Sequence, residues 1–188
     1  MFRFLIICLI IFIYILFFNN PSFGIEYIED FFSEEDFLMI KRECSKLVKN
    51  LKDPQNPLAP NRLSVDVPNK NYISKKCNSP ETKIKLKIPE NTEPSDIPVE
   101  YRKYPMGGSM DWHKDVVLYT HPQYEMVYTV DNTSDSKTLW YDPQNKIVNE
   151  ITTKPNSMIV IKADDIQHCV TPVTHGERSI IKFAYKQT

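Results

Sequence analysis

Short runs with alternating apolar and polar residues occupy the second half of the chain, each separated from the next by turn residues. This pattern predicts strands at 99–104, 110–119, 124–130, 138–141, 157–162 and 179–185. Several short strands at such spacing indicate a sandwich or a barrel, so we expect a mainly β domain.

A different periodicity precedes these strands. Ser33 followed by Asp36 resembles a helix N-cap, and apolar residues then recur at helical spacing: Phe37, Ile40, Cys44, Leu47, Val48 and Leu51. We expect an N-terminal amphipathic helix that supports one sheet of the domain. Between the helix and the strands, residues 53–98 are polar and rich in proline, which predicts a long irregular excursion. Long excursions in compact domains are often lids.

Composition limits the number of domains and the class of partner. A chain of 188 residues, 41% of them hydrophobic, can bury one sizeable core, so we expect one domain at 25–188. The formal net charge is −1, and the charges of both signs are mixed along the chain. Nucleic acid is therefore not an expected partner.

Residues 1–24 have the character of a targeting segment. An uncharged apolar run at 4–18 follows Arg3. As a helix it would span about 22 Å, short of the roughly 30 Å hydrocarbon core, so a signal peptide competes with a short membrane anchor. Ser22 and Gly24 suit signal cleavage, whereas an uncut helix would anchor the domain to a membrane. Both alternatives place the domain in the secretory pathway or an endomembrane lumen, either secreted or attached by a single pass.

Three residues form a candidate metal site. His113 and Asp115 are two residues apart in a predicted strand and therefore project from the same face, and His168 follows a distant apolar run. Two imidazoles and one carboxylate are the ligand set of non-haem iron(II) oxygenases. A lone His-x-Asp pair is more often structural, but here further motifs accompany the pair.

These motifs resemble the 2-oxoglutarate oxygenase superfamily, in particular its branch of prolyl 4-hydroxylase-like and lysyl hydroxylase-like enzymes. The stretch from His168 to Arg178 contains Pro172-Val173, Gly176 and the terminal Arg in the family's order, and Tyr104-Pro-Met-Gly-Gly precedes His113. The segment 25–47 also resembles the family's first strand and helix. The resemblance covers 25–185 except for the excursion at 53–98.

The resemblance implies a double-stranded β-helix, or jelly roll, that binds iron(II) through His113, Asp115 and His168 and uses 2-oxoglutarate and dioxygen as co-substrates. Ascorbate is a further candidate cofactor. Arg178 would bind the distal carboxylate of 2-oxoglutarate, with Tyr104 and Thr138 as additional candidates beside it. The glycines of the family's turn near Thr138 are absent here.

The implied reaction is hydroxylation of a C–H bond, with a prolyl or lysyl side chain of a protein or peptide as the leading substrate. The excursion at 53–98 would then fold over the site as a lid that grips the peptide. A small molecule or glycan is the alternative substrate, and an inactive jelly-roll binding module is the alternative from another functional class.

Three cysteines remain outside the apolar run: Cys44, Cys77 and Cys169. In an oxidising compartment Cys44 and Cys77 form the favoured disulfide, because Cys169 directly follows a candidate metal ligand and would be held in the core. The odd count leaves one thiol free.

Overall fold

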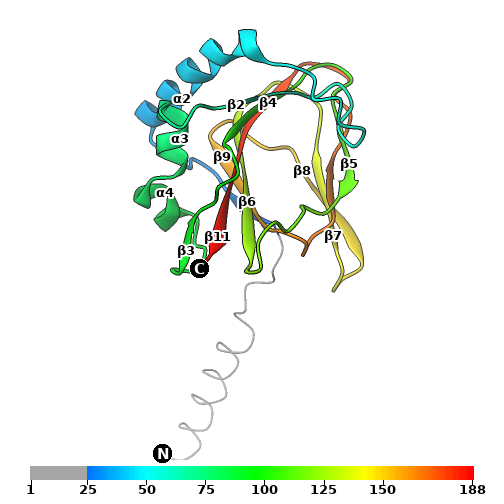
Figure 1. Cartoon of the computed structure of the whole chain (residues 1–188). Helices are drawn as coiled ribbons and strands as arrows, with labels where there is room; N and C mark the ends of the chain where they lie inside the picture. The colour runs from blue at the N-terminus through cyan, green and yellow to red at the C-terminus, as the bar shows by residue number, and fades with distance from the viewer. Residues whose placement is uncertain (1–24) are drawn as a thin grey trace, which may run out of the picture.

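The computed structural model describes residues 25–188, which form two antiparallel sheets (Figure 1). The large sheet contains, in spatial order, β1 (Glu26–Ile28), β9 (Ser157–Lys162), β6 (Gln123–Asn132), β11 (Arg178–Gln187), β4 (Glu100–Tyr104) and β2 (Leu63–Asp66), while β3 (Thr92–Pro94) also pairs with β11. The small sheet contains β5 (Met110–His113), β10 (His168–Val170), β7 (Thr138–Asp142) and β8 (Ile147–Ile151). The predicted mainly β jelly roll is confirmed.

The large sheet buries both of its faces. Alternate residues of β11, namely Ile181, Phe183 and Tyr185, lie in the main hydrophobic core, which is shared with the helices. Ile180, between them on the opposite face, packs in a second cluster with Tyr104 and Val173. Because successive side chains of a strand point to opposite faces, one strand supplies both a core and the interior between the two sheets.

Three helices lie on the side of the large sheet away from the small sheet (Figure 1). Helix α2 (Glu34–Leu47) begins after Ser33, whose side chain accepts a hydrogen bond from the Asp36 N–H, and it buries Ile40, Cys44 and Leu47. A short 3-10 turn, η1 (Val48–Asn50), follows it. Helices α3 (Tyr72–Cys77) and α4 (Pro80–Lys85) complete this layer.

The prediction of an irregular excursion at 53–98 is wrong. These residues contain β2, α3, α4 and β3, and Ile73, Cys77 and Leu86 are fully buried in the main core. Two of the polar residues that suggested loops are helix caps, since Asn71 and Ser79 cap α3 and α4. Pro80 lies in the first turn of α4, where the missing N–H costs no helical hydrogen bond.

Two smaller expectations also change. The predicted strand at 110–119 ends at His113, so Asp115 lies just beyond it. The favoured disulfide is absent, since Cys44, Cys77 and Cys169 are all free and buried. Burial raises the pKa of the Cys44 thiol to about 12 and that of the Cys77 thiol further, so both are protonated and contribute as small apolar side chains.

Within residues 25–188, no helix combines the length and the apolar character needed to cross a bilayer. The apolar run at 4–18, on which the prediction of a signal peptide or membrane anchor rests, lies outside the described residues.

A pair of matched substitutions tests whether the segment 53–98 belongs to the core. Replacing Ile73, which has no exposed surface, by Ala should lower the free energy of unfolding by about 3 kcal/mol, because it leaves a cavity between α3 and the sheet. Ile84→Ala, in the neighbouring helix and 79% exposed, should change it by less than about 0.5 kcal/mol. Urea unfolding measures both, and similar values for the two variants would contradict the observed packing.

Candidate metal centre

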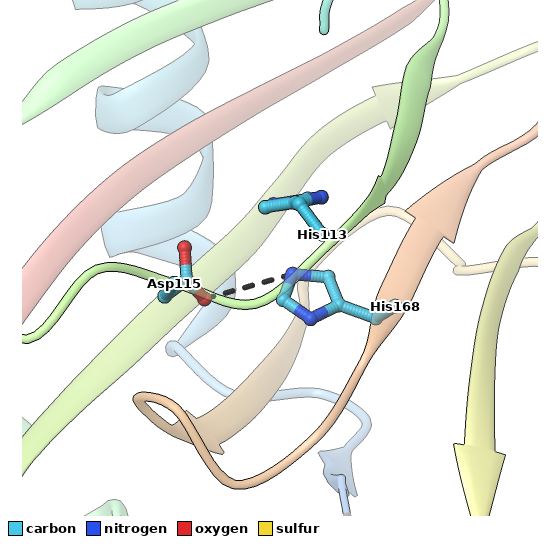
Figure 2. Close-up of side chains that lie close together, drawn as sticks. All are labelled: His113, Asp115 and His168. Atoms are coloured by element: carbon cyan, nitrogen blue, oxygen red, sulfur yellow. Dashed lines mark ion pairs between the residues drawn. The ribbon is translucent and has the colours of Figure 1, made fainter.

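His113, Asp115 and His168 come together at one end of the space between the sheets (Figure 2). One ligand atom from each residue lies within 4.8 Å of the other two. Asp115 and His168 are buried, and the His168 Nε2 lies 3.5 Å from the Asp115 Oδ2. The three residues predicted from the sequence as a metal site are therefore adjacent, although 53 residues separate Asp115 from His168 along the chain.

Strand pairing explains how the two histidines meet. β5 and β10 are neighbours in the small sheet, and His113 pairs directly with His168 in their register. The two ring centroids are 4.3 Å apart. Asp115 then approaches from the chain segment that leaves β5, so three donors reach one point without a helix or a long loop.

Backbone carbonyls fix the orientation of both imidazoles. The Nδ1 of His113 lies 2.8 Å from the Asp111 carbonyl oxygen, and the Nδ1 of His168 lies 3.1 Å from the Ile166 carbonyl oxygen. A carbonyl only accepts, so Nδ1 carries the proton in each ring and Nε2 is left with its lone pair. Burial and the neighbouring His168 lower the pKa of His113, which favours the neutral form that a metal requires.

Lys182 supplies a positively charged side chain beside the three candidate metal ligands. Its Nζ donates to the Asp115 Oδ1 at 2.8 Å and lies 3.4 Å from the Glu125 Oε2. Burial alone would raise the pKa of Asp115, but Lys182, His168 and His113 outweigh it, so the pKa of Asp115 is lowered. Burial raises the pKa of Glu125, which Lys182 only partly offsets. Lys182 thus holds one oxygen of Asp115, while the other faces the histidines.

A pocket extends from the three donors into the interior between the sheets and ends at Arg178. Arg178 is 1% exposed, and its Nη1 donates to the Thr138 Oγ1 at 3.0 Å. Tyr104, which pairs with Arg178 in the register of β4 and β11, lines the same pocket. The structure therefore brings all three predicted co-substrate residues, Arg178, Tyr104 and Thr138, together beside the metal donors.

The buried guanidinium of Arg178 has no protein anion as partner. In the described part of the chain it forms no ion pair, and its Nε has no hydrogen-bond partner. An unpaired charge in the interior is costly, so a ligand carrying a carboxylate fits the end of this pocket. Two imidazoles and a carboxylate likewise fit a divalent transition metal such as iron(II). The residues present therefore suit both 2-oxoglutarate and iron.

Sequence reasoning missed the charged residues around the metal donors. Lys182 lies four residues after Arg178 on the same face of β11, so strand alternation would have placed it in the site. Glu125 carries no such signal, because a carboxylate in a strand is ordinarily exposed. The other two histidines of the chain, His121 and His175, are exposed and lie outside the cluster.

Comparison with solved structures shows which known proteins have this architecture. A prolyl-4-hydroxylase from Pseudomonas putida superposes with a TM-score of 0.72 at 10% sequence identity, covering 90% of this chain and 96% of that one. A prolyl hydroxylase from Trichoplax adhaerens, in complex with a peptide fragment of hypoxia inducible factor, gives 0.72 at 13% identity, covering 89% and 85%. HygX from Streptomyces hygroscopicus, with nickel and 2-oxoglutarate bound, gives 0.70 at 11%, covering 92% and 86%.

The chain has the fold of the 2-oxoglutarate oxygenases. This agrees with the resemblance to the prolyl 4-hydroxylase-like branch that its motifs suggested. Neither the family models nor the curated proteins contain a match to the sequence. The oxygenase fold is therefore recognised through its structure and a few spaced residues rather than through overall similarity.

The ion pairs of Lys182 generate a prediction for the metal-free protein. Lys182→Met would leave the buried carboxylates of Asp115 and Glu125 without their cation, so we expect a loss of about 3 kcal/mol in the free energy of unfolding at neutral pH. Adding Glu125→Gln should recover part of this loss, because one buried charge is removed.

Lys186→Met is the matched control on the same strand. Lys186 pairs with the exposed carboxylates of Asp96 and Glu93, so its removal should change stability little. Urea unfolding after dialysis against a chelator compares the four proteins. Equal losses for the Lys182 and Lys186 variants would show that the buried ion pairs contribute nothing beyond exposed ones.

Proposed function

We propose that this protein is an iron(II)- and 2-oxoglutarate-dependent dioxygenase that hydroxylates a C–H bond. One observation carries the proposal. The pocket that contains the His113, Asp115 and His168 donors also ends at Arg178, a fully buried guanidinium without a carboxylate partner. A metal site alone would not need this cation, and a structural arginine would have an anionic partner.

The residues of the site have separable roles in this reaction. Iron bound there would activate dioxygen, with oxidative decarboxylation of 2-oxoglutarate to succinate and carbon dioxide supplying the electrons. His113, Asp115 and His168 hold the metal, and the planar fork of Arg178 binds the distal carboxylate of 2-oxoglutarate, with Thr138 and Tyr104 beside it. The apolar walls formed by Ile159 and Ile161 keep water from the co-substrate.

Asp115 also bears on the type of reaction. Because a protein carboxylate occupies the third ligand position, no place is left there for a halide. This favours hydroxylation over halogenation.

For the substrate, we infer a prolyl or lysyl side chain of a peptide or protein. Two observations support this choice: the motifs resemble the prolyl and lysyl hydroxylase branch, and the Trichoplax adhaerens structure with a comparable fold is a prolyl hydroxylase in complex with a peptide. A small-molecule substrate is the second candidate, because HygX, of comparable similarity, has hygromycin B bound in one structure.

Anaerobic titration with iron(II) and 2-oxoglutarate tests the site. The weak metal-to-ligand charge-transfer absorption requires both on one metal, and we expect it in the domain from Ile25 onward. His168→Ala should abolish the band, whereas the exposed His121→Ala should leave it unchanged.

Arg178→Met should keep metal binding but weaken the affinity for 2-oxoglutarate by about 30-fold or more, since two charge-assisted bonds are lost. Absence of the band from folded, iron-loaded protein would favour the binding-module alternative.

Succinate formation separates the substrate classes. If the substrate is a peptide, proline-rich or lysine-containing peptides should raise succinate production well above the uncoupled rate, and mass spectrometry should find one added oxygen on the peptide. Stimulation only by small metabolites would instead support the second candidate.

A further inference from the structure

Arg62 is a second buried arginine without an anionic partner. It is 5% exposed and forms no ion pair within the described residues. Its side chain contacts two neutral partners, since Nη1 donates to the Met110 Sδ at 3.6 Å and the guanidinium also hydrogen-bonds to Tyr104, while its Nε has no hydrogen-bond partner. The co-substrate explains the unpaired charge of Arg178, but Arg62 lies in another part of the cavity.

Strand register places Arg62 on the inner face of the large sheet. Leu63 pairs with Lys103 across β2 and β4, so Arg62 extends the same register opposite Tyr104. It lines a pocket that opens outward from His113 and Asp115, whereas Arg178 lines the inner pocket. The two arginines therefore lie beside different parts of the cavity that surrounds the metal donors.

Neighbouring charges do not neutralise Arg62. Glu100 is the carboxylate whose charge acts on it, but Glu100 forms its ion pair with Arg102. Burial and the adjacent Arg102 lower the pKa of Arg62, with the Tyr104 hydroxyl and Glu100 opposing them. Lys182, in the same pocket, already pairs with Asp115 and Glu125. Arg62 is thus a lining cation whose charge is left unmatched.

The exposed residues that line this outer pocket are mostly apolar, with Lys114 as the charged exception. Leu58, Val116 and Leu118 line it and are 45%, 72% and 63% exposed. Exposed apolar side chains around a buried cation suit a ligand that presents a hydrocarbon portion at the rim and a negative group inside.

We propose that Arg62, with Arg102 beside it, is a subsite for a carboxylate of the primary substrate, next to the carbon that is oxidised. The proposal rests on the proposed oxygenase function and narrows its substrate class. The carboxylate can belong to an acidic residue flanking the target prolyl or lysyl residue, or to the α-carboxylate of a free amino acid. In both cases the guanidinium fork binds the same group, in the outer pocket rather than in the pocket that ends at Arg178.

Equilibrium binding tests this subsite without turnover. The protein is loaded with nickel(II) and 2-oxoglutarate, and calorimetry measures two sets of probes. The first set contains blocked tetrapeptides with a prolyl or lysyl residue next to Asp or Glu, each compared with its Asn or Gln counterpart. The second contains free proline and lysine, each compared with its primary amide. In one set the carboxylate form should bind at least about 10-fold more tightly, the effect of one charge-assisted hydrogen bond.

Arg62→Gln should remove this preference and leave the binding of the amide forms unchanged. Arg42→Gln, at an exposed position on α2, is the matched control and should keep the preference. Arg102→Gln provides a second test at a less buried position and should reduce the preference. The iron and 2-oxoglutarate band, measured for every variant, shows that the metal site is intact.

Four outcomes would overturn the subsite while leaving the oxygenase proposal standing. Carboxylate and amide probes could bind alike or not at all, or the preference could persist in Arg62→Gln. If Arg62→Gln were the only variant to lose the band, Arg62 would instead support the binding of 2-oxoglutarate, by way of its neighbour Tyr104 in the inner pocket. A parent protein without the band would refute the oxygenase proposal itself, which distinguishes the two failures.

Discussion

Strand alternation along β11 is the constraint on which the rest of the structure depends. This strand pairs with β4 on one side and β6 on the other, so a change of register by one residue would exchange its two faces. Arg178, Ile180 and Lys182 would then enter the helix-side core, and Phe183 and Tyr185 would enter the site. Burial of aromatic side chains against α2 and α3 thus fixes the position of the two cations that organise the pocket.

The interior between the sheets carries several buried charged side chains, among them Asp115, Glu125 and Arg178. Hydrophobic burial on the helix side stabilises the fold, so the opposite face of the same sheet can hold Lys182, Glu125 and Asp115 at close range. These three compensate one another in the metal-free protein. Arg178 and Arg62 form no ion pair among the described residues, and an anionic ligand, as proposed for both, would offset the cost of burying them. If both arginines bind anionic ligands, the ligand-free protein bears a cost in stability that ligand binding would remove.

The structure brings the residues predicted as a site close together, while their roles as ligands stay a prediction, and it differs from the sequence-based prediction for part of their surroundings. His113, Asp115, His168 and Arg178 carry spacing that is specific enough to identify from one chain, and the main strands follow their alternation. The segment 53–98 was misinterpreted because its capping residues and prolines are typical of loops. Its two helices, α3 and α4, are only six residues long, which is too short to show a helical repeat of apolar residues. Arg62 was missed for the same reason, since a residue in a presumed loop is not expected to be buried.

The position of Arg62 connects that misinterpretation to function. Residues 56–62 and 97–98 are the parts of the segment that reach the outer pocket, whereas α3 and α4 pack on the far side of the large sheet. The segment is anchored by α3, α4 and β2, and its residues at 56–62 and 97–98 form part of the wall of the outer pocket, while a lid over the site stays a prediction. A wall held by the core can orient a buried guanidinium, which a mobile lid would leave hydrated and weakly selective. If Arg62 binds the substrate as proposed, selectivity for the substrate depends on the same packing that stabilises the fold.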